Sequence, residues 1–305
     1  MIRRRMLRII DWRTIVLGVG VLLAVAGCAR GDDAVEVSES SPASTSSAAV
    51  ARYVHLGDSY ASGTGVAPLQ ENSPFQCIRS SKNFAQLIAK RLDEPVTDVS
   101  CASADTADIF DSQYYGVPPQ LDALGPQTTL VTMMLGGNDN KIFGDTIRLC
   151  GDLASADPTG SPCTDRYGTD LFAPISEKTY PSLVTALRAI REHAPNARVL
   201  IVGYPWIMPE TQGCYPDMRV AAGDVPFVRE MQTLLNSTVQ RAAQATGVEF
   251  VDMSAVSEGH DACEPAGTRW IEPMTSTASS LGPVAHPNAA GQQSMADQVA
   301  DALKR

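Results

Sequence analysis

Five short apolar runs alternate with helical patterns along most of the chain, and this alternation limits the possible folds more than any other feature. Each run has the length and composition of a strand that is buried on both faces, as in a parallel sheet. The alternation predicts a doubly wound α/β fold, with three α/β/α layers around a five-stranded parallel sheet. The predicted strands are 53–56, 96–100, 129–135, 199–203 and 248–251.

Three long segments between these elements show no regular pattern, and each follows a predicted strand. They should therefore lie at the carboxyl ends of the strands, where open α/β sheets bind ligands. The segments are 140–176, 204–225 and 253–285. Their large apolar side chains could line a pocket or simply cover the core: Trp206, Ile207, Met208, Tyr215, Trp270, Ile271 and Met274.

The segment from Val54 to Gly63 passes abruptly from apolar residues to small polar ones. This change predicts a buried strand that ends just before Ser59, where a helix can begin. A serine there has an exposed hydroxyl beside backbone N–H groups that could stabilise an oxyanion. Taken alone, the segment is equally consistent with Ser59 as a helix N-cap.

Three short motifs occur in an order that resembles the SGNH (GDSL-type) hydrolases. They are Gly57-Asp58-Ser59, then Gly136-Gly137-Asn138-Asp139 after another apolar run, and the sequence HPNAAG at 286–291. The cysteine spacing and the segment 259–263 resemble the secreted actinobacterial lipase and esterase branch of this family. The resemblance implies that Ser59 is the nucleophile. It also supports the strand order 2-1-3-4-5.

The general base must be one of only four histidines. His55 lies inside the first predicted strand, and His193 lies near the end of a helix, where a surface contact with the helix dipole is the ordinary explanation. His260, beside Cys263 in a loop, is the one serious competitor. His286 matches the last motif of the family, and the resemblance implies that it is the base.

Acyl transfer also requires hydrogen-bond donors for the oxyanion. We expect the backbone N–H of Ser59 and the side chain of Asn138 to supply two of them. The family usually has a glycine in the loop after the second strand as a third donor, but this chain has none there. We expect Ser103 to take that place, with Ala104 as the alternative.

The residues before His286 depart from the family pattern in a second way. Many SGNH enzymes have an aspartate three residues before the catalytic histidine, whereas this chain has Pro283 there. Some secreted relatives use a backbone carbonyl to orient the imidazole instead. We therefore expect a Ser–His dyad in which the carbonyl of Pro283 or Val284 orients His286.

The N-terminus has the pattern of an exported protein. Five arginines and one acid precede an apolar run that ends in Ala26-Gly27-Cys28. This resembles a bacterial lipobox, so we expect a lipoprotein-type signal peptide at 1–27 and lipidation of Cys28. An ordinary signal peptide and an uncleaved anchor remain alternatives. Residues 28–49 have the composition of a disordered tether, which leaves 50–305 as the SGNH hydrolase domain.

The charge of the mature chain argues against nucleic acid as a partner. The whole chain has 24 basic and 34 acidic residues; removing five and one leaves 19 and 33, a net charge of −14. A phosphate backbone requires a basic surface. We expect membrane contact through the N-terminal lipid anchor, and we expect the protein to be a monomer.

Six cysteines remain after Cys28, an even number that favours disulfides in an exported protein. No C-x-x-C or H-E-x-x-H motif is present, which disfavours a zinc site. We expect neither a metal nor a cofactor. The family pattern implies the pairs Cys77–Cys101, Cys150–Cys163 and Cys214–Cys263.

Taken together, the sequence predicts an exported serine esterase or lipase that hydrolyses a small-molecule or lipid ester through an acyl-enzyme. A carbohydrate O-acetylesterase or an acyltransferase of the same fold is the nearest alternative. A non-catalytic solute-binding lipoprotein or adhesin is a more distant one, because it would not need Ser59, Asn138 and His286 together.

Overall fold

The computed structural model describes residues 52–275 and 285–305. Five parallel strands form one sheet in the order β2-β1-β3-β4-β5, which confirms the predicted fold class and strand order. The predicted strand boundaries differ from the observed ones by at most two residues. The strands are β1 (Tyr53–Gly57), β2 (Val96–Asp98), β3 (Leu130–Met134), β4 (Arg198–Val202) and β5 (Glu249–Val251).

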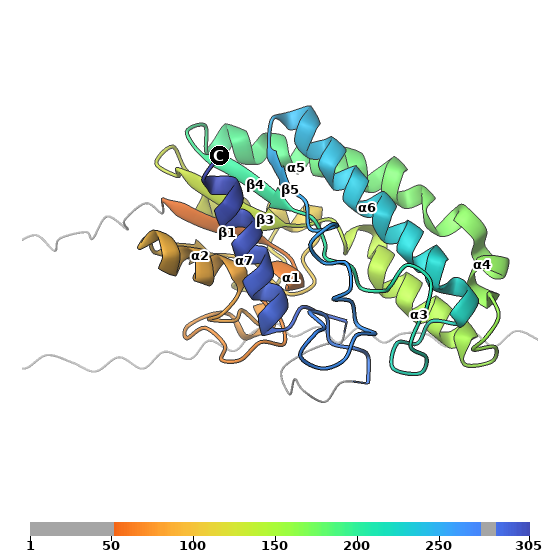
Figure 1. Cartoon of the computed structure of the whole chain (residues 1–305). Helices are drawn as coiled ribbons and strands as arrows, with labels where there is room; N and C mark the ends of the chain where they lie inside the picture. The colour runs from red at the N-terminus through yellow and green to blue at the C-terminus, as the bar shows by residue number, and fades with distance from the viewer. Residues whose placement is uncertain (1–51, 276–284) are drawn as a thin grey trace, which may run out of the picture. The chain divides into compact units, whose positions relative to one another are not determined.

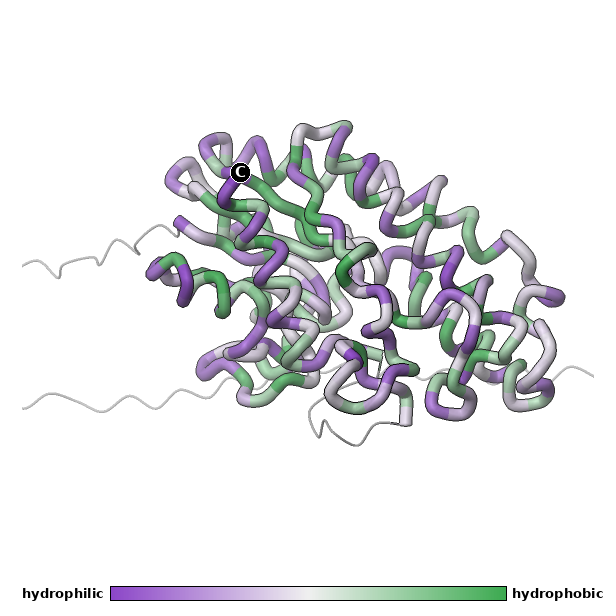
Figure 2. The backbone as a smooth tube through the Cα atoms, in the orientation of Figure 1, coloured by the Kyte–Doolittle hydropathy of each residue, from purple (hydrophilic) through white to green (hydrophobic). Residues whose placement is uncertain are grey.

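The central strands form the middle of the core. Every residue of β1 and β3 is buried, and hydrophobic residues run along the centre of the sheet (Figure 2). In the register of the sheet, Val54 lies between Thr97 on β2 and Val131 on β3. Because both faces of the sheet are covered, the sequences of these strands are predominantly apolar rather than alternating between apolar and polar residues.

Helices cover both faces of the sheet (Figure 1). α2 packs beside α7 on one face, and α5 packs beside α6 on the other. The predicted apolar stripes face inward; Leu183, Leu187 and Ile190 of α5, for example, are fully buried. In the described part of the chain, no helix has both the length and the apolar character needed to cross a bilayer. The helices are α1 (Ser59–Ser62), α2 (Phe84–Leu92), α3 (Ile142–Ala154), α4 (Pro162–Tyr167), α5 (Tyr180–His193), α6 (Val225–Thr246) and α7 (Ala289–Leu303).

One sequence-based prediction is wrong: segment 140–176 is not irregular but contains α3 and α4. The buried positions of α3 are four residues apart, but they include Thr146 and Cys150 rather than large aliphatic residues. Two glycines further weaken the helical pattern. The disulfide between Cys150 and Cys163 joins the two helices.

Candidate active site

The turn after β1 places Ser59 at the edge of the sheet. Gly57 has a φ of +124°, and a Cβ there would lie 2.2 Å from the carbonyl oxygen of Met134, so only glycine fits. Asp58 then caps α1 by accepting hydrogen bonds from the N–H groups of Tyr60 and Ala61. The N-cap is thus Asp58, and the alternative that Ser59 is the N-cap is wrong. Ser59 is the first helical residue and is 9% exposed.

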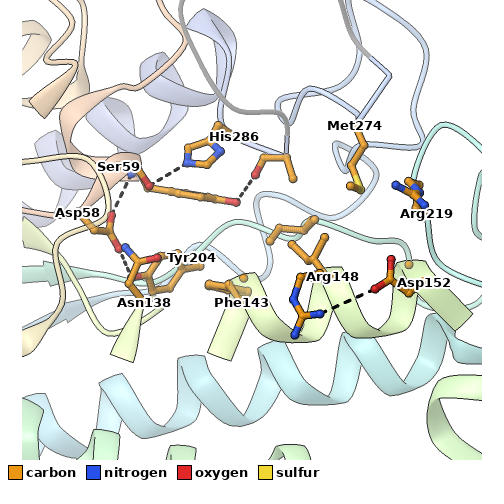
Figure 3. Close-up of a pocket in the computed structure, with 16 residues that line it drawn as sticks. Asp58, Ser59, Asn138, Phe143, Arg148, Asp152, Tyr204, Arg219, Met274 and His286 are labelled. Atoms are coloured by element: carbon orange, nitrogen blue, oxygen red, sulfur yellow. Dashed lines mark hydrogen bonds and ion pairs between the residues drawn. The ribbon is translucent and has the colours of Figure 1, made fainter. Parts of the chain in front are cut away.

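The structure brings Ser59 and His286 together. Nε2 of His286 lies 2.8 Å from Oγ of Ser59, within the range of an O–H···N hydrogen bond (Figure 3). His286 lies three residues before α7, and the backbone N–H of Glu272 donates to its carbonyl. This geometry allows the imidazole to remove the proton of the Ser59 hydroxyl.

The other three histidines have different surroundings. Nδ1 of His260 lies 2.6 Å from the carbonyl oxygen of Thr268, and its ring stacks on Trp270 with a centroid separation of 4.0 Å. His55 is fully buried in β1, as expected, and His193 contacts a carbonyl of its own helix. Of the four histidines, all of which lie within the described residues, only His286 makes a hydrogen bond to Ser59.

Two of the three expected oxyanion donors, the N–H of Ser59 and the amide of Asn138, belong to residues that line the same cavity. Nδ2 of Asn138 donates to the carbonyl of Ala104 at 3.0 Å, which fixes the amide and leaves its second hydrogen available. The N–H of Ala104 already donates to Cys101, whereas no described residue accepts from the N–H of Ser103. This difference favours Ser103 over Ala104.

Ser103 is exposed and has a φ of +66°, a conformation that glycine adopts more readily than other residues. The glycine that the family has at this position would adopt this backbone without strain.

Tyr204 joins the loops that follow two neighbouring strands. Its hydroxyl donates to Oδ2 of Asp58 at 2.5 Å and accepts from the N–H of Gly137 at 2.8 Å. All of these groups are buried, so the loss of either hydrogen bond would leave an unsatisfied polar group and lower the stability of the fold. Burial raises the pKa of Asp58 to about 6, although hydrogen bonds from Tyr204 and the α1 backbone lower it. Tyr204 thus holds the Ser59 turn against the Asn138 loop.

Asp139 makes a similar connection to the loop after β2. It accepts from both the N–H and the hydroxyl of Thr106, each at 2.9 Å. Burial raises the pKa of Asp139 to about 7, despite these bonds. The carboxyl therefore titrates near neutral pH.

Tyr60 connects the nucleophile to the base. Its hydroxyl donates to the carbonyl of Ala285 at 2.6 Å, and its ring lies 4.9 Å from that of His286. Ala285 itself has a φ of +62°, which is unfavourable for a residue with a Cβ. Tyr60 thus contacts the residue directly before His286.

Neither Tyr60 nor Tyr204 was predicted from the sequence. The available signals were their positions, since Tyr60 directly follows Ser59 and Tyr204 lies two residues beyond β4. Of the apolar loop residues, Ile207 and Met274 line the cavity at Ser59. The others lie elsewhere: Met208 and Ile271 are in the core, Trp206 lines a different cavity, Trp270 stacks on His260, and Tyr215 is 40% exposed.

The disulfides are the three that the family pattern implied: Cys77–Cys101, Cys150–Cys163 and Cys214–Cys263. Their presence fits an oxidising, extracytoplasmic compartment. Across 52–275 and 285–305, no cluster of three or more His, Cys, Asp or Glu side chains could hold a metal ion. Cys28, Pro283 and Val284 lie outside the described residues.

Comparison with known proteins identifies the family of the chain. Residues 55–294 match the GDSL-like lipase/acylhydrolase family. Lipase 2 of Streptomyces coelicolor is 49% identical over 254 residues, which cover 82% of this chain and 85% of the relative. The crystal structure of phospholipase A1 from Streptomyces albidoflavus has a TM-score of 0.69 and 27% identity, covering 83% of this chain and 99% of that one.

An extracellular lipase of Streptomyces rimosus is similar to the same extent, with a TM-score of 0.67, 26% identity, and coverage of 82% of this chain and 99% of that one. The family match extends over most of the described domain and includes all three motifs. The chain therefore belongs to the GDSL-like lipase/acylhydrolase family and is a carboxylic ester hydrolase.

Proposed function

We propose that the protein is an exported lipase or esterase that hydrolyses carboxylic esters through an acyl-enzyme on Ser59. The observation that carries this proposal is the 2.8 Å contact between Ser59 Oγ and His286 Nε2 at the end of a largely apolar cavity. An apolar cavity favours an acyl chain. An acetylated sugar would favour polar and stacking walls, so the carbohydrate esterase alternative is less well supported.

In the first half of the reaction, Oγ of Ser59 attacks the ester carbonyl carbon while Nε2 of His286 takes the hydroxyl proton. The negative charge that develops on the carbonyl oxygen accepts hydrogen bonds from the N–H of Ser59, the N–H of Ser103 and the amide of Asn138. The C–O bond then breaks, and His286 gives its proton to the leaving alkoxide, which departs as an alcohol.

In the second half, a water molecule attacks the acyl carbon and gives a proton to His286. The bond to Ser59 Oγ breaks, the proton returns to Oγ, and a carboxylic acid is released. Every step uses side chains and backbone groups of this chain.

The base acts in a Ser–His dyad, with the carbonyl of Pro283 or Val284 as the orienting group. Several acids of the neighbouring loop have other partners, which supports this assignment. Glu258 pairs with Arg229 at 2.5 Å, and Asp261 accepts from the N–H of Cys263 at 2.9 Å. Neutralising the loop acids one at a time should cost less than about tenfold in kcat, far below the 10⁴-fold loss of a triad aspartate. A loss of thousands for one variant would reveal a triad. The acids are Asp252, Glu258, Asp261, Glu264 and Glu272.

Export follows the signal peptide at 1–27, after which Cys28 carries the lipid anchor and 28–49 separates it from the enzyme domain at 50–305. The three disulfides and the extracellular relative support the compartment. Mass spectrometry of membrane fractions should find a lipid-modified N-terminal Cys28. A released chain that begins elsewhere would contradict the anchor.

The roles of Ser59 and His286 can be tested with p-nitrophenyl esters. Replacing either residue with alanine should lower kcat by about 10⁶, as in comparable serine hydrolases. His260→Ala provides the matched control and should keep most of the activity. If His260→Ala is inactive while His286→Ala is active, the base has been assigned to the wrong histidine.

A further inference from the structure

A cavity of about 360 Å³ extends from Ser59 along one side of α3. Its wall on α3 is formed by residues that share one helix face, including Phe143, Gly144, Ile147 and Gly151. Ile207 and Met274 line the remainder of its apolar part. In Figure 3, Ser59 and His286 lie at one end, and Arg219 and Asp152 lie at the other.

The face of α3 that lines the cavity differs from the face that packs on the core. Ile142, Thr146, Cys150 and Ala154 face the core and are buried. Phe143 and Ile147 are only half-buried, although both are large and apolar. Such a stripe beside the nucleophile is suited to an apolar ligand.

The length of this stripe can be read from the helix. Phe143 lies at the nucleophile end, since its ring contacts that of Tyr204, the partner of Asp58. Gly151 lies at the far end, where an added Cβ would be 3.4 Å from Cβ of Arg219. The eight residue-to-residue steps from Phe143 to Gly151 correspond to about 12 Å of helix. An extended alkyl chain advances about 1.3 Å per carbon, given C–C bonds of ~1.5 Å, so about eight to ten carbons fit.

The far end of the cavity changes from apolar to charged. Arg148 and Asp152 form an ion pair of 3.8 Å there, and Arg219 is exposed. A longer alkyl chain would meet these charged groups and solvent, so further methylenes would gain little. The apolar part of the cavity thus has a defined length.

We infer that this cavity is the acyl-chain site, that it accepts chains of up to about eight to ten carbons, and that Gly144 keeps it open. The inference rests on the proposed function and names its substrate class, medium-chain acyl esters. Gly144 is exposed to the cavity, has no positive φ, and an added Cβ would meet no atom within 4 Å. A larger side chain at this position would therefore fill the cavity without displacing the helix.

The first measurement is kcat/KM of the full mature protein for p-nitrophenyl esters from acetate to dodecanoate. Each methylene that enters the cavity should raise kcat/KM by up to about fourfold, and the increase should stop near eight to ten carbons. A profile that falls steadily from acetate, or one that still rises at dodecanoate, would overturn the inference.

The second measurement is the ratio of octanoate to acetate hydrolysis in variants of Gly144. Gly144→Leu should lower this ratio by about 16- to 60-fold, because its side chain takes the space of two to three methylenes. Gly144→Ala should give a smaller decrease. Ala245→Leu, on the exposed side of α6, adds a leucine outside the cavity and should leave the ratio unchanged.

The two proposals fail in different ways. Absence of ester hydrolysis by the wild type, or full activity of Ser59→Ala, would contradict the proposed function. Normal ester hydrolysis with an unchanged octanoate-to-acetate ratio in Gly144→Leu would overturn the acyl-chain site alone.

Discussion

Tyr60→Phe removes a single hydroxyl that connects the nucleophile to the base. That hydroxyl lies 2.6 Å from the carbonyl oxygen of Ala285, the residue before His286. Both Tyr60 and Ala285 are 5% exposed, so water cannot readily replace the lost bond. The phenyl ring of the variant keeps the packing against His286, and the change therefore isolates the hydrogen bond. We predict that Tyr60 is a positioning residue for His286.

Two free-energy contributions determine the expected decrease in kcat of Tyr60→Phe. The hydrogen bond contributes about 0.5 to 1.5 kcal/mol, and its loss leaves a buried carbonyl without this donor. The φ of +62° at Ala285 costs about 1 to 2 kcal/mol, which the chain can recover by relaxing once the bond is gone. If relaxation moves His286 away from Ser59, a penalty of one to two kcal/mol corresponds to a decrease in kcat of about 5- to 30-fold.

The assay is steady-state kinetics with a soluble p-nitrophenyl ester, together with urea unfolding. For Tyr60→Phe, kcat should fall while KM stays nearly constant, because the imidazole acts in the chemical step. Tyr53→Phe is the matched control: it removes another buried hydroxyl, 2.8 Å from Thr132 Oγ1 and within β1. This control should lose stability but keep kcat. Equal kcat values for Tyr60→Phe and wild type, or a change in KM alone, would refute a positioning role.

Three further predictions concern Asn138, Asp139 and the disulfide between Cys214 and Cys263. Asn138→Ala should lower kcat by about 10² to 10³ with little change in KM in steady-state assays; a rise mainly in KM would mean that Asn138 binds the substrate instead. The pKa of Asp139 is raised to about 7 in the folded protein, so its contribution to stability is present below about pH 4 and is lost as the pH rises through 7. This loss should be absent in Asp139→Asn. The change in the free energy of unfolding between pH 4 and pH 8, measured by urea unfolding, should therefore differ between the variant and the wild type by up to about 4 kcal/mol. Equal changes in the two proteins would contradict the prediction. Replacing Cys214 and Cys263, which are 49 residues apart, should lower the free energy of unfolding by about 4 kcal/mol, and an unchanged denaturation midpoint would show that this disulfide does not stabilise the fold.

The sequence predicted those parts of the protein that local patterns determine. Apolar runs located the strands, and the Gly57-Asp58-Ser59 motif located the turn after β1. The resemblance to the family pointed to His286 and to the disulfide pairs. These features depend on neighbouring residues or on short motifs, so they can be read without knowledge of the fold.

The features that the sequence did not reveal depend on contacts between distant residues. The cavity wall on α3 was missed because its apolar stripe faces a cavity and its buried face uses Thr146 and Cys150. The role of Tyr204 depends on bonds to groups 146 and 67 positions away. No local pattern distinguishes such a tyrosine from one that merely packs in the core.

The hydrogen bonds of Tyr204 indicate which parts of the enzyme can change in evolution without disturbing the reacting groups. The reacting groups after β1 and β3 are held by a tyrosine after β4, so their arrangement depends on the sheet itself. The acyl chain, by contrast, is expected to contact α3 and surface loops, and the α3 residue that packs against Tyr204 is Phe143. Substitutions on α3 beyond Phe143 can therefore adapt the enzyme to new substrates while the reacting groups stay in place. Laboratory evolution of chain-length preference should accordingly begin on this helix.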